Sequence, residues 1–348
     1  MELGRLLRTQ EILILALVIV FSTIITIVNP SFFSFENLFD LVRSNSGVAI
    51  LAVGIFIVLL SGGIDVSSTT IAIAGQYIAV NVLLASGINS IALAFLVSIG
   101  VGVALGAINA LFVSLLNIPT LIVTLGTSSL FHGALLEFVG SRSINSGNLP
   151  SAIKDFGRTN IIPLTRANGS EYGLSVFFLI AVAVIVLTWY ILKYTMLGRG
   201  IYAIGGNQEA AERVGFNIKK IKFFIYCYSG FLAGIMGVMH VALIRTANPQ
   251  YLVGSELSII AAVVIGGARL TGGVGTMAGT ILGVVLVTIL EKNLVLLGLP
   301  SYWQKFFIGA VLIIGVVITY GEILTKKRKG AASGARPEIK QVEAEGVR

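Results

Sequence analysis

The sequence predicts an all-α, polytopic membrane protein with about ten transmembrane helices. Of its 348 residues, 56% are hydrophobic and only 11% are charged, against about 25% charged residues in an ordinary soluble domain. Apolar runs recur that are long enough to cross a hydrocarbon core, which takes about 20 residues per helix. The 40 glycines fit this class, because small residues let membrane helices pack closely. Lipid is therefore the expected solvent around most of the chain.

The first apolar run, 12–28, follows Arg5 and Arg8 and so resembles the start of a signal peptide. No small-residue cleavage site comes after it; the chain continues with Asn29-Pro30. We therefore expect the run to be retained as the first membrane helix. The further predicted spans, with ends set to within a few residues, are 47–61, 67–86, 90–113, 119–139, 173–192, 223–244, 257–268, 274–291 and 304–320. The run 257–268 is short enough to predict a half-helix, so the expected count is nine to eleven.

Basic residues set the predicted orientation. Six Lys and Arg residues fall in segment 193–222 and seven in 326–348, so both segments are expected to be cytoplasmic. Four predicted spans lie between them, and five spans from a cytoplasmic N-terminus place segment 141–172 outside. The basic residues of that outer segment are spread at a lower density: Arg142, Lys154, Arg158 and Arg166. We expect a multi-pass protein of the bacterial inner membrane with both termini in the cytoplasm.

One membrane domain is predicted over residues 1–325, with a large basic loop at about 193–222 and an outer loop at about 141–172. The remainder, 326–348, begins with Lys326-Lys327-Arg328-Lys329 and has few apolar residues to bury. We predict that it is a disordered cytoplasmic tail and not a second domain.

Several function classes lack support. The net charge of +8 is explained by basic cytoplasmic loops, so no nucleic-acid partner is expected. The dipeptide Gly-Lys is absent, which excludes the common phosphate-binding loop. Cys227 is the only cysteine, and His132 and His240 lie in different spans, so no metal site is predicted. No catalytic residue stands out, and a membrane enzyme is the weakest alternative.

The stretch 207–215, inside the basic loop, predicts a short capped helix. Asn207 can accept an N-cap hydrogen bond, and Glu209 places negative charge in the first turn. Arg213 falls in the last turn, and Gly215 can take the left-handed closing conformation. The helix has a narrow apolar strip of Ala210, Ala211 and Val214. Such a strip suits a groove on another protein, although periodicity alone favours a solvated loop helix.

A weak internal repeat aligns two glycine breaks. When residues 58–75 are laid over residues 262–279, the Gly-Gly pairs at 62–63 and 266–267 coincide. Glycine-interrupted apolar segments at corresponding places in two halves point to a transport pathway in repeat-built transporters. Ordinary helix connections explain the same pattern equally well.

Polar residues within the spans are the candidates for a pathway or gate: Asp65, Gln76, Asn81, Asn109, His132, His240 and Arg269. Their alternative roles are helix capping, charge pairing and hydrogen bonds between helices, and the repeat predicts an Asp65–Arg269 pair. A sugar is uncharged and rich in hydroxyls, so its route needs scattered polar groups and no strong counter-ion. An ion-coupled transporter normally places an ionisable residue well inside the bundle, and only histidine meets that description.

Four stretches of the chain resemble one protein family. Glu209-Ala210-Ala211, with Gly215 four residues later, resembles the core of the EAA loop of binding-protein-dependent import permeases. Stretches 60–67, 117–126 and 264–275 resemble the sugar branch of that family. Over about residues 40–320, the chain is similar to permeases of the ribose, xylose, arabinose, galactose, rhamnose and autoinducer-2 group of ATP-binding-cassette importers. Branched-chain amino acid permeases are more distantly similar.

Two departures from the family pattern leave the substrate open. The family commonly has Ser-Val-Gly where this chain has Val66-Ser67-Ser68-Thr69, and Arg-Gly where this chain has His132-Gly133. A branched-chain amino acid or nucleoside permease is therefore the alternative to a sugar permease.

The resemblance implies the permease fold with a cytoplasmic coupling helix and a set of partners. Two permease chains, identical or homologous, form the pore, and two ATPase subunits beneath them bind ATP and Mg. A periplasmic or lipid-anchored binding protein delivers the sugar, while this chain binds no cofactor. The residues implied to dock on the ATPase are Gly206, Asn207, Glu209, Ala210, Ala211, Arg213 and Gly215.

Overall fold

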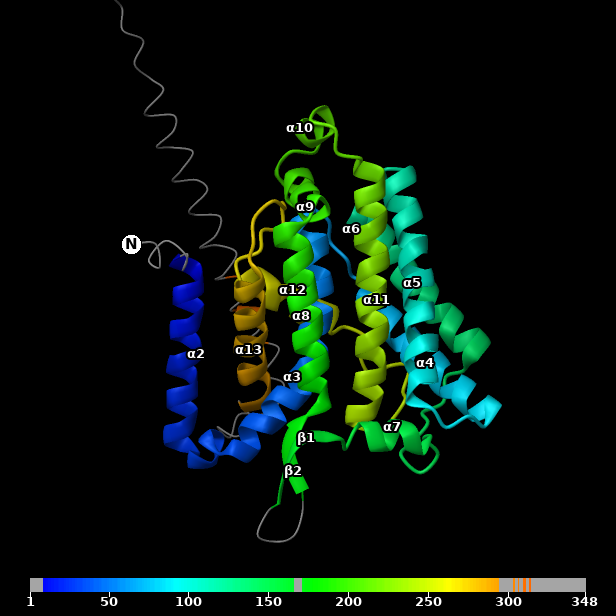
Figure 1. Cartoon of the computed structure of the whole chain (residues 1–348), viewed down its shortest axis with the longest axis vertical. Coiled ribbons are helices and arrows are strands. Elements are labelled where there is room, and N and C mark those ends of the chain that lie inside the picture. The colour runs from blue at the N-terminus through cyan, green and yellow to red at the C-terminus, as the bar shows by residue number, and fades with distance from the viewer. Residues whose placement is uncertain are drawn as a thin grey trace, which may run out of the picture.

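Hydrophobic runs separated by polar connections fold into a bundle of helices that lie side by side (Figure 1). The computed structural model describes residues 9–165 and 171–293, and five positions beyond them: Trp303, Phe306, Gly309, Ala310 and Ile313. The described helices are α2 (Thr9–Val28), α3 (Phe35–Leu60), α4 (Ser68–Ser86), α5 (Ile91–Leu115), α6 (Thr120–Ala134), α7 (Ser151–Phe156), α8 (Val176–Tyr194), α9 (Met196–Gly206), α10 (Gln208–Arg213), α11 (Ile218–Ile244), α12 (Glu256–Ile265) and α13 (Met277–Asn293).

Three smaller elements complete the described chain. A 3₁₀ turn (Pro30–Phe33) precedes α3, and a π-helical turn (Leu135–Val139) extends α6. Strands β1 (Asn160–Thr165) and β2 (Glu171–Ser175) pair antiparallel in a hairpin. The fold is therefore all-α apart from this two-stranded sheet.

The predicted spans up to residue 291 each coincide with a helix, although α3 begins well before its predicted span 47–61. In the described residues, seven helices are long and apolar enough to cross a membrane: α2, α3, α4, α5, α6 with its π-helical extension, α8 and α11. The short run 257–268 is the 10-residue α12, as predicted, and the run 274–291 is the 17-residue α13. The last predicted span, 304–320, and the tail 326–348 lie outside the described residues, apart from four positions within that span.

Two loops contain structure that the hydrophobic pattern did not predict. The predicted outer loop 141–172 holds α7 and most of the hairpin, and the predicted span 173–192 begins within β2. The predicted basic loop 193–222 holds α9 as well as α10. Helix α10 projects from one end of the bundle and the hairpin from the other (Figure 1), so the two loops lie on opposite sides, as the predicted topology requires.

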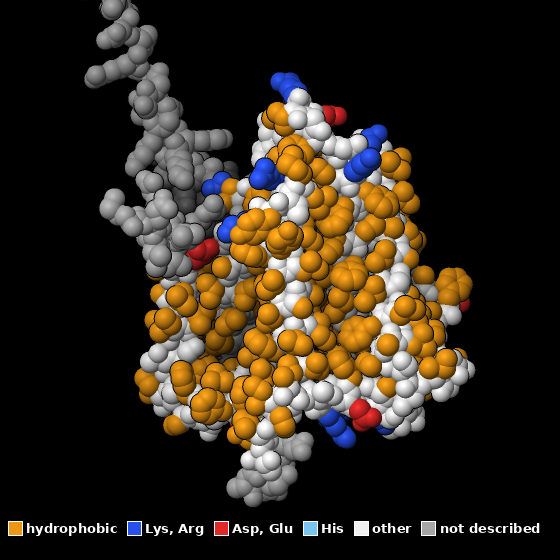
Figure 2. Space-filling model, viewed as in Figure 1, with side chains coloured by type: hydrophobic (Ala, Val, Ile, Leu, Met, Phe, Trp, Pro, Cys, Tyr) orange, Lys and Arg blue, Asp and Glu red, His pale blue; other side chains and the backbone are white. Residues whose placement is uncertain are grey.

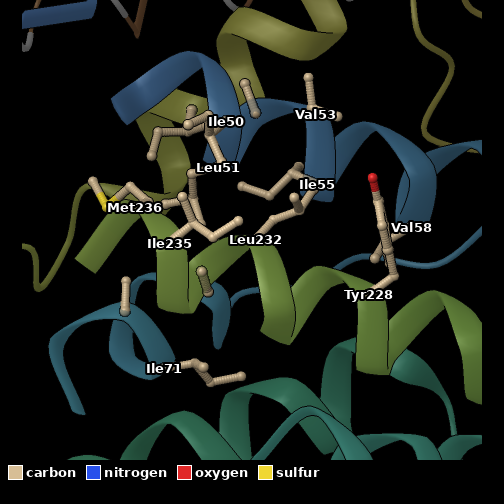
Figure 3. Packing of buried hydrophobic residues seen from close by; sticks show 14 of the residues in the cluster. Ile50, Leu51, Val53, Ile55, Val58, Ile71, Tyr228, Leu232, Ile235 and Met236 are labelled. Carbon is tan, nitrogen blue, oxygen red and sulfur yellow. The ribbon is translucent and has the colours of Figure 1, made fainter. Parts of the chain in front are cut away.

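The core lies along α11, which packs against α3, α4 and α5. Figure 3 shows Ile50, Leu51 and Ile55 of α3 directed toward Leu232 and Ile235 of α11. In the apolar window of α11, 78% of the residues are buried, against 17% in α2. The outer helices expose apolar side chains in a wide band, with charged side chains gathered at the two ends (Figure 2). This distribution suits a bundle surrounded by lipid.

Glycine sets the distance between α5 and α11. A side-chain carbon at Gly102 would overlap the carbonyl oxygen of Gly230, and one at Gly230 would overlap the carbonyl oxygen of Gly102. One helical turn away, the Ser98 hydroxyl donates to the carbonyl oxygen of Gly234 at 2.7 Å. The two backbones are in direct contact, which confirms the close packing expected from the glycine content.

The two glycine breaks of the repeat form the same turn. Gly62 (φ +82°) follows α3, and Gly267 (φ +95°) follows α12. At each place, the amide of this glycine donates to the carbonyl oxygen three residues earlier in the chain. The next amide donates to the carbonyl oxygen five residues earlier, which is the Schellman arrangement. The predicted alignment paired Gly62 with Gly266 and was wrong by one residue. The turns match when Gly62 is paired with Gly267, because helix closure depends on the left-handed residue.

Candidate functional site

Helix α10 begins and ends as its sequence predicts. The Asn207 side-chain oxygen accepts a hydrogen bond from the Ala210 amide at 3.0 Å. Gly215 has φ +93°, and its amide donates to the carbonyl oxygen of Glu212 at 3.0 Å. The amide of Phe216 donates to the carbonyl oxygen of Ala211, which completes a Schellman closure. Both ends of a six-residue helix are thus fixed by local hydrogen bonds.

The surface of α10 is mostly polar. The side chains of Glu209 and Arg213 are 85% and 82% exposed and lie 3.9 Å apart, a pairing worth little in water. Val214 is 74% exposed, but Ala211 is only 2% exposed and belongs to the main hydrophobic core. The predicted strip of Ala210, Ala211 and Val214 is therefore divided. Ala211 anchors α10 to the bundle, and the other two residues face outward.

A second feature is the segment 61–67 between α3 and α4, which holds a buried carboxylate. Asp65 is 1% exposed, and its Oδ1 accepts from the amide of Ser67 at 2.8 Å and from its hydroxyl at 2.7 Å. Its Oδ2 accepts from the Ser229 hydroxyl of α11 at 3.1 Å. Asn109 of α5 donates to the Ser67 hydroxyl at 2.7 Å. The carboxylate thus joins the N-cap of α4 to α11 through charge-assisted hydrogen bonds, and Ser67 extends the connection to α5.

The predicted pair of Asp65 and Arg269 does not form. Both residues are described, and no ion pair joins them; Arg269 is half-buried in the α12–α13 loop, where its amide donates to the carbonyl oxygen of Val274 at 3.0 Å. Asp65 instead lies at the start of α4, where an amide and hydroxyls satisfy its charge. A helix N-terminus stabilises a carboxylate without a basic partner.

The other predicted polar residues are spread over the bundle and bonded within the chain. His240 Nδ1 and Gln76 Oε1 are hydrogen-bonded at 3.0 Å between α11 and α4. Asn81 donates to the carbonyl oxygen of Tyr77 on its own helix at 2.8 Å. His132 Nε2 donates to the carbonyl oxygen of Pro249 at 3.0 Å. Two cavities of about 510 and 870 Å³ between α8 and the α2–α13 pair are lined by none of the candidate pathway residues.

Three of the four stretches that carry the family resemblance meet at one place, and the end of α9, directly before the fourth, lies against two of them. In the first stretch, the Ile64 amide donates to Thr120 Oγ1 at 3.0 Å, and its carbonyl oxygen accepts from Thr124 Oγ1 at 3.1 Å. The carbonyl oxygen of Leu60 accepts from the Gly273 amide at 2.9 Å. Gly205, at the end of α9 and close before α10, lies against Leu60 of the first stretch and Gly273 of the last.

This convergence was not predicted from the sequence. The signal for it is the glycine content of residues 205–206 and 272–273, because glycine lets backbones approach closely. Such a pattern shows that a close approach occurs somewhere, but not which segment is the neighbour.

A many-spanning helical bundle with an exposed capped helix in a basic loop, and with no phosphate-binding loop in its sequence, has the features of a membrane permease subunit. The family model described as "Branched-chain amino acid transport system / permease component" matches residues 37–316, and the chain belongs to this permease family.

Curated relatives cover nearly the whole chain. The ribose import permease protein RbsC of Escherichia coli K12 is 34% identical over 316 residues, 90% of this chain and 94% of that protein. The Haemophilus influenzae protein of the same name is 33% identical over 320 residues, 91% and 94% of the two chains. The autoinducer 2 import system permease protein LsrC of Enterobacter sp. strain 638 is 32% identical over 319 residues, 91% and 88% of the two chains. No solved structure matches the chain.

Proposed function

We propose that this chain is the membrane-spanning permease subunit of an ATP-driven importer for a small sugar. The observation that carries the proposal is α10, a capped helix exposed at one end of a permease-family bundle. Relatives named as ribose and autoinducer-2 import permeases favour a sugar or a related small carbohydrate over an amino acid.

The energy source belongs to a partner. ATP and Mg bind an ATPase subunit that docks on α10 through its exposed face, which includes Glu209, Arg213 and Val214. Because the docking helix must meet a cytoplasmic ATPase, the α10 end of the bundle is the cytoplasmic end. Helix α2 starts toward this same end, in agreement with a cytoplasmic N-terminus (Figure 1).

The sugar route is proposed to run between two permease chains. Within one chain, the buried His240 and Asp65 already have protein partners, and the two cavities are lined mostly by apolar side chains. A second copy or a homologue would complete the route. A binding protein docks on the opposite end, which carries the β1–β2 hairpin, and delivers the sugar there.

The test is reconstitution of the chain in proteoliposomes with its ATPase and binding-protein partners. We expect uptake of one of D-ribose, D-xylose or D-galactose that requires ATP on the ATPase side and persists with an uncoupler. Leucine serves as the competing substrate. Uptake that needs no ATP and collapses with the uncoupler would establish an ion-coupled transporter, and uptake of leucine alone would establish an amino acid permease.

A further inference from the structure

Five glycines bring three separate segments into backbone contact directly behind α10. They are Gly62 after α3, Gly205 and Gly206 at the end of α9, and Gly272 and Gly273 in the α12–α13 loop; together we name them the glycine joint. Only Asn207 separates the joint from the first residue of α10. The inference below rests on the proposed function, because it concerns how movement of α10 reaches the membrane helices.

At Gly205, Gly272 and Gly273, the contacts in the glycine joint leave no room for a side chain. A side-chain carbon at Gly205 would overlap the carbonyl oxygen of Leu60 and the amide of Gly273. One at Gly272 would lie 2.6 Å from the amide nitrogen of Gly62 and 2.8 Å from the Cα of Gly205. Side-chain contacts can yield by changing rotamer, but direct backbone contacts cannot. A shift of the α9 end therefore displaces both neighbouring segments.

Hydrogen bonds connect the joint to the rest of the bundle. The Gly273 amide donates to the carbonyl oxygen of Leu60 at 2.9 Å, and the Tyr202 hydroxyl of α9 donates to the carbonyl oxygen of Gly275 at 3.1 Å. These bonds hold the end of α3, α9 and the α12–α13 loop together. The Schellman turn at Gly62 is thus next to the end of α9, and so are Gly272 and Gly273 of the loop that follows the second turn.

The segment 61–67 carries the connection further. Ile64 bonds to Thr120 and Thr124 of α6, and Asp65 bonds to Ser229 of α11 and, through Ser67, to α5. A displacement at Gly62 acts on a segment that is hydrogen-bonded to α4, α5, α6 and α11. These contacts form a continuous route from the docking helix to most of the core.

We propose that the glycine joint is the coupling element of the transporter, which converts displacement of α10 by the ATPase into movement of α3 and of the α12–α13 loop at the same time. The joint acts as a shear contact, in which packed elements slide together as units. Gly205 is a positioning residue in this scheme: it touches neither sugar nor nucleotide, and it sets where α10 stands relative to the bundle.

The test compares Gly205→Ala with Gly100→Ala, because a side-chain carbon at Gly100 of α5 meets nothing within 4 Å. The whole complex is purified with its ATPase, and the sugar transported by the wild type is used as the probe in proteoliposomes. Gly205→Ala is expected to keep the ATPase bound and hydrolysing ATP, while the sugar moved per ATP falls at least about fivefold. Gly100→Ala is expected to match the wild type.

The outcomes separate this inference from the proposed function. A wild-type complex without ATP-driven sugar uptake would remove the proposed function, and the joint with it. If the wild type moves sugar with ATP, and Gly205→Ala and Gly100→Ala move equal amounts of sugar per ATP, the joint alone would be overturned. If Gly205→Ala fails to assemble, Gly273→Asn decides: asparagine accepts the positive φ of this position, and its side-chain carbon would lie 2.8 Å from the amide nitrogen of Gly206. Less sugar moved per ATP in Gly273→Asn than in Gly100→Ala supports the joint, and an equal amount overturns it.

Discussion

At the scale of single residues, Asp65 shows how a charge is held inside the bundle without a basic partner. Its two oxygens accept three hydrogen bonds, and the donors come from the start of α4 and from α11. A buried charge is tolerated when its lone pairs are satisfied. Asp65 therefore has a structural role in fixing the α3–α4 segment, whatever it contributes to transport.

Replacing Asp65 by asparagine should destabilise the protein. The amide keeps the shape, but it removes the charge that strengthens the bonds from Ser67 and Ser229. We expect the free energy of unfolding to fall by about 1.5 to 3 kcal/mol, the range for hydrogen bonds to charged groups. Thermal unfolding of the purified protein in detergent measures this. Asp155→Asn, on the exposed side of α7, is the control and should unfold like the wild type.

Exchange of the two repeat-related charges should not rescue either single change. Because Asp65 bonds to hydroxyls and not to Arg269, the double variant Asp65→Arg, Arg269→Asp places an unpaired guanidinium among Ser67 and Ser229. We expect its yield of folded protein to be no higher than that of Asp65→Arg alone. Recovery of the wild-type yield in the double variant would restore the pairing hypothesis.

At the scale of elements, α10 illustrates a helix that depends on its ends. Six residues are too few for a helix to be stable by its own hydrogen bonds, since helices shorter than about 12 residues are marginal in water. The Asn207 cap, the Gly215 closure and the burial of Ala211 supply what length does not.

Loss of the N-cap should loosen α10 and weaken ATPase docking. Asn207→Ala removes a side-chain hydrogen bond whose loss typically costs about 1 kcal/mol. We expect faster hydrogen exchange in α10 and less ATPase after purification, with unchanged insertion in the membrane. Asn217→Ala is the matched control, because Asn217 caps the 27-residue α11 in the same way. Equal loss of ATPase in both variants would contradict a special role for the α10 cap.

The elements differ in how far their sequences predict them. The spans within the described residues follow from hydropathy and the α10 caps from neighbouring residues, and the structure has a helix at each of these spans and both caps. The hairpin was missed because its strands are short and β1 contains Pro163. Helix α9 was missed because it has four glycines among 11 residues, and its stability depends on tertiary contacts such as that of Gly200 with Ile221. The partners of Asp65 include Ser229, 164 residues away, which no local pattern indicates.

At the scale of the whole molecule, the fold has a deeply buried centre and a more exposed periphery. Helices α3, α4 and α11 are buried over 67%, 72% and 78% of their apolar windows, whereas α2 and α5 are buried over 17% and 22%. One face of α5 nevertheless makes direct backbone contact with α11 of the centre. Changes at this contact are therefore expected to affect the entire bundle.

Adding one methyl group at the α5–α11 contact should destabilise the bundle. Gly230→Ala forces the two helices apart, because its side chain would overlap the carbonyl oxygen of Gly102. Overpacking of this kind costs about 1 to 3 kcal/mol. We expect a lower midpoint of thermal unfolding in detergent. Gly126→Ala is the control, since nothing lies within 4 Å of its added carbon; equal midpoints for the two variants would contradict the packing argument.

Helix α11 joins the two ends of the molecule in one piece. Its 27 residues extend about 40 Å. Near one end Ile221 packs over Gly200 of α9, and near the other Ala242 packs against Gly157 beside α7. Under the proposed function, the ATPase and the binding protein therefore act near opposite ends of the same helix, α11. Thermodynamic linkage then makes the influence mutual: the factor by which nucleotide changes the affinity for the loaded binding protein equals the factor by which that protein changes the affinity for nucleotide.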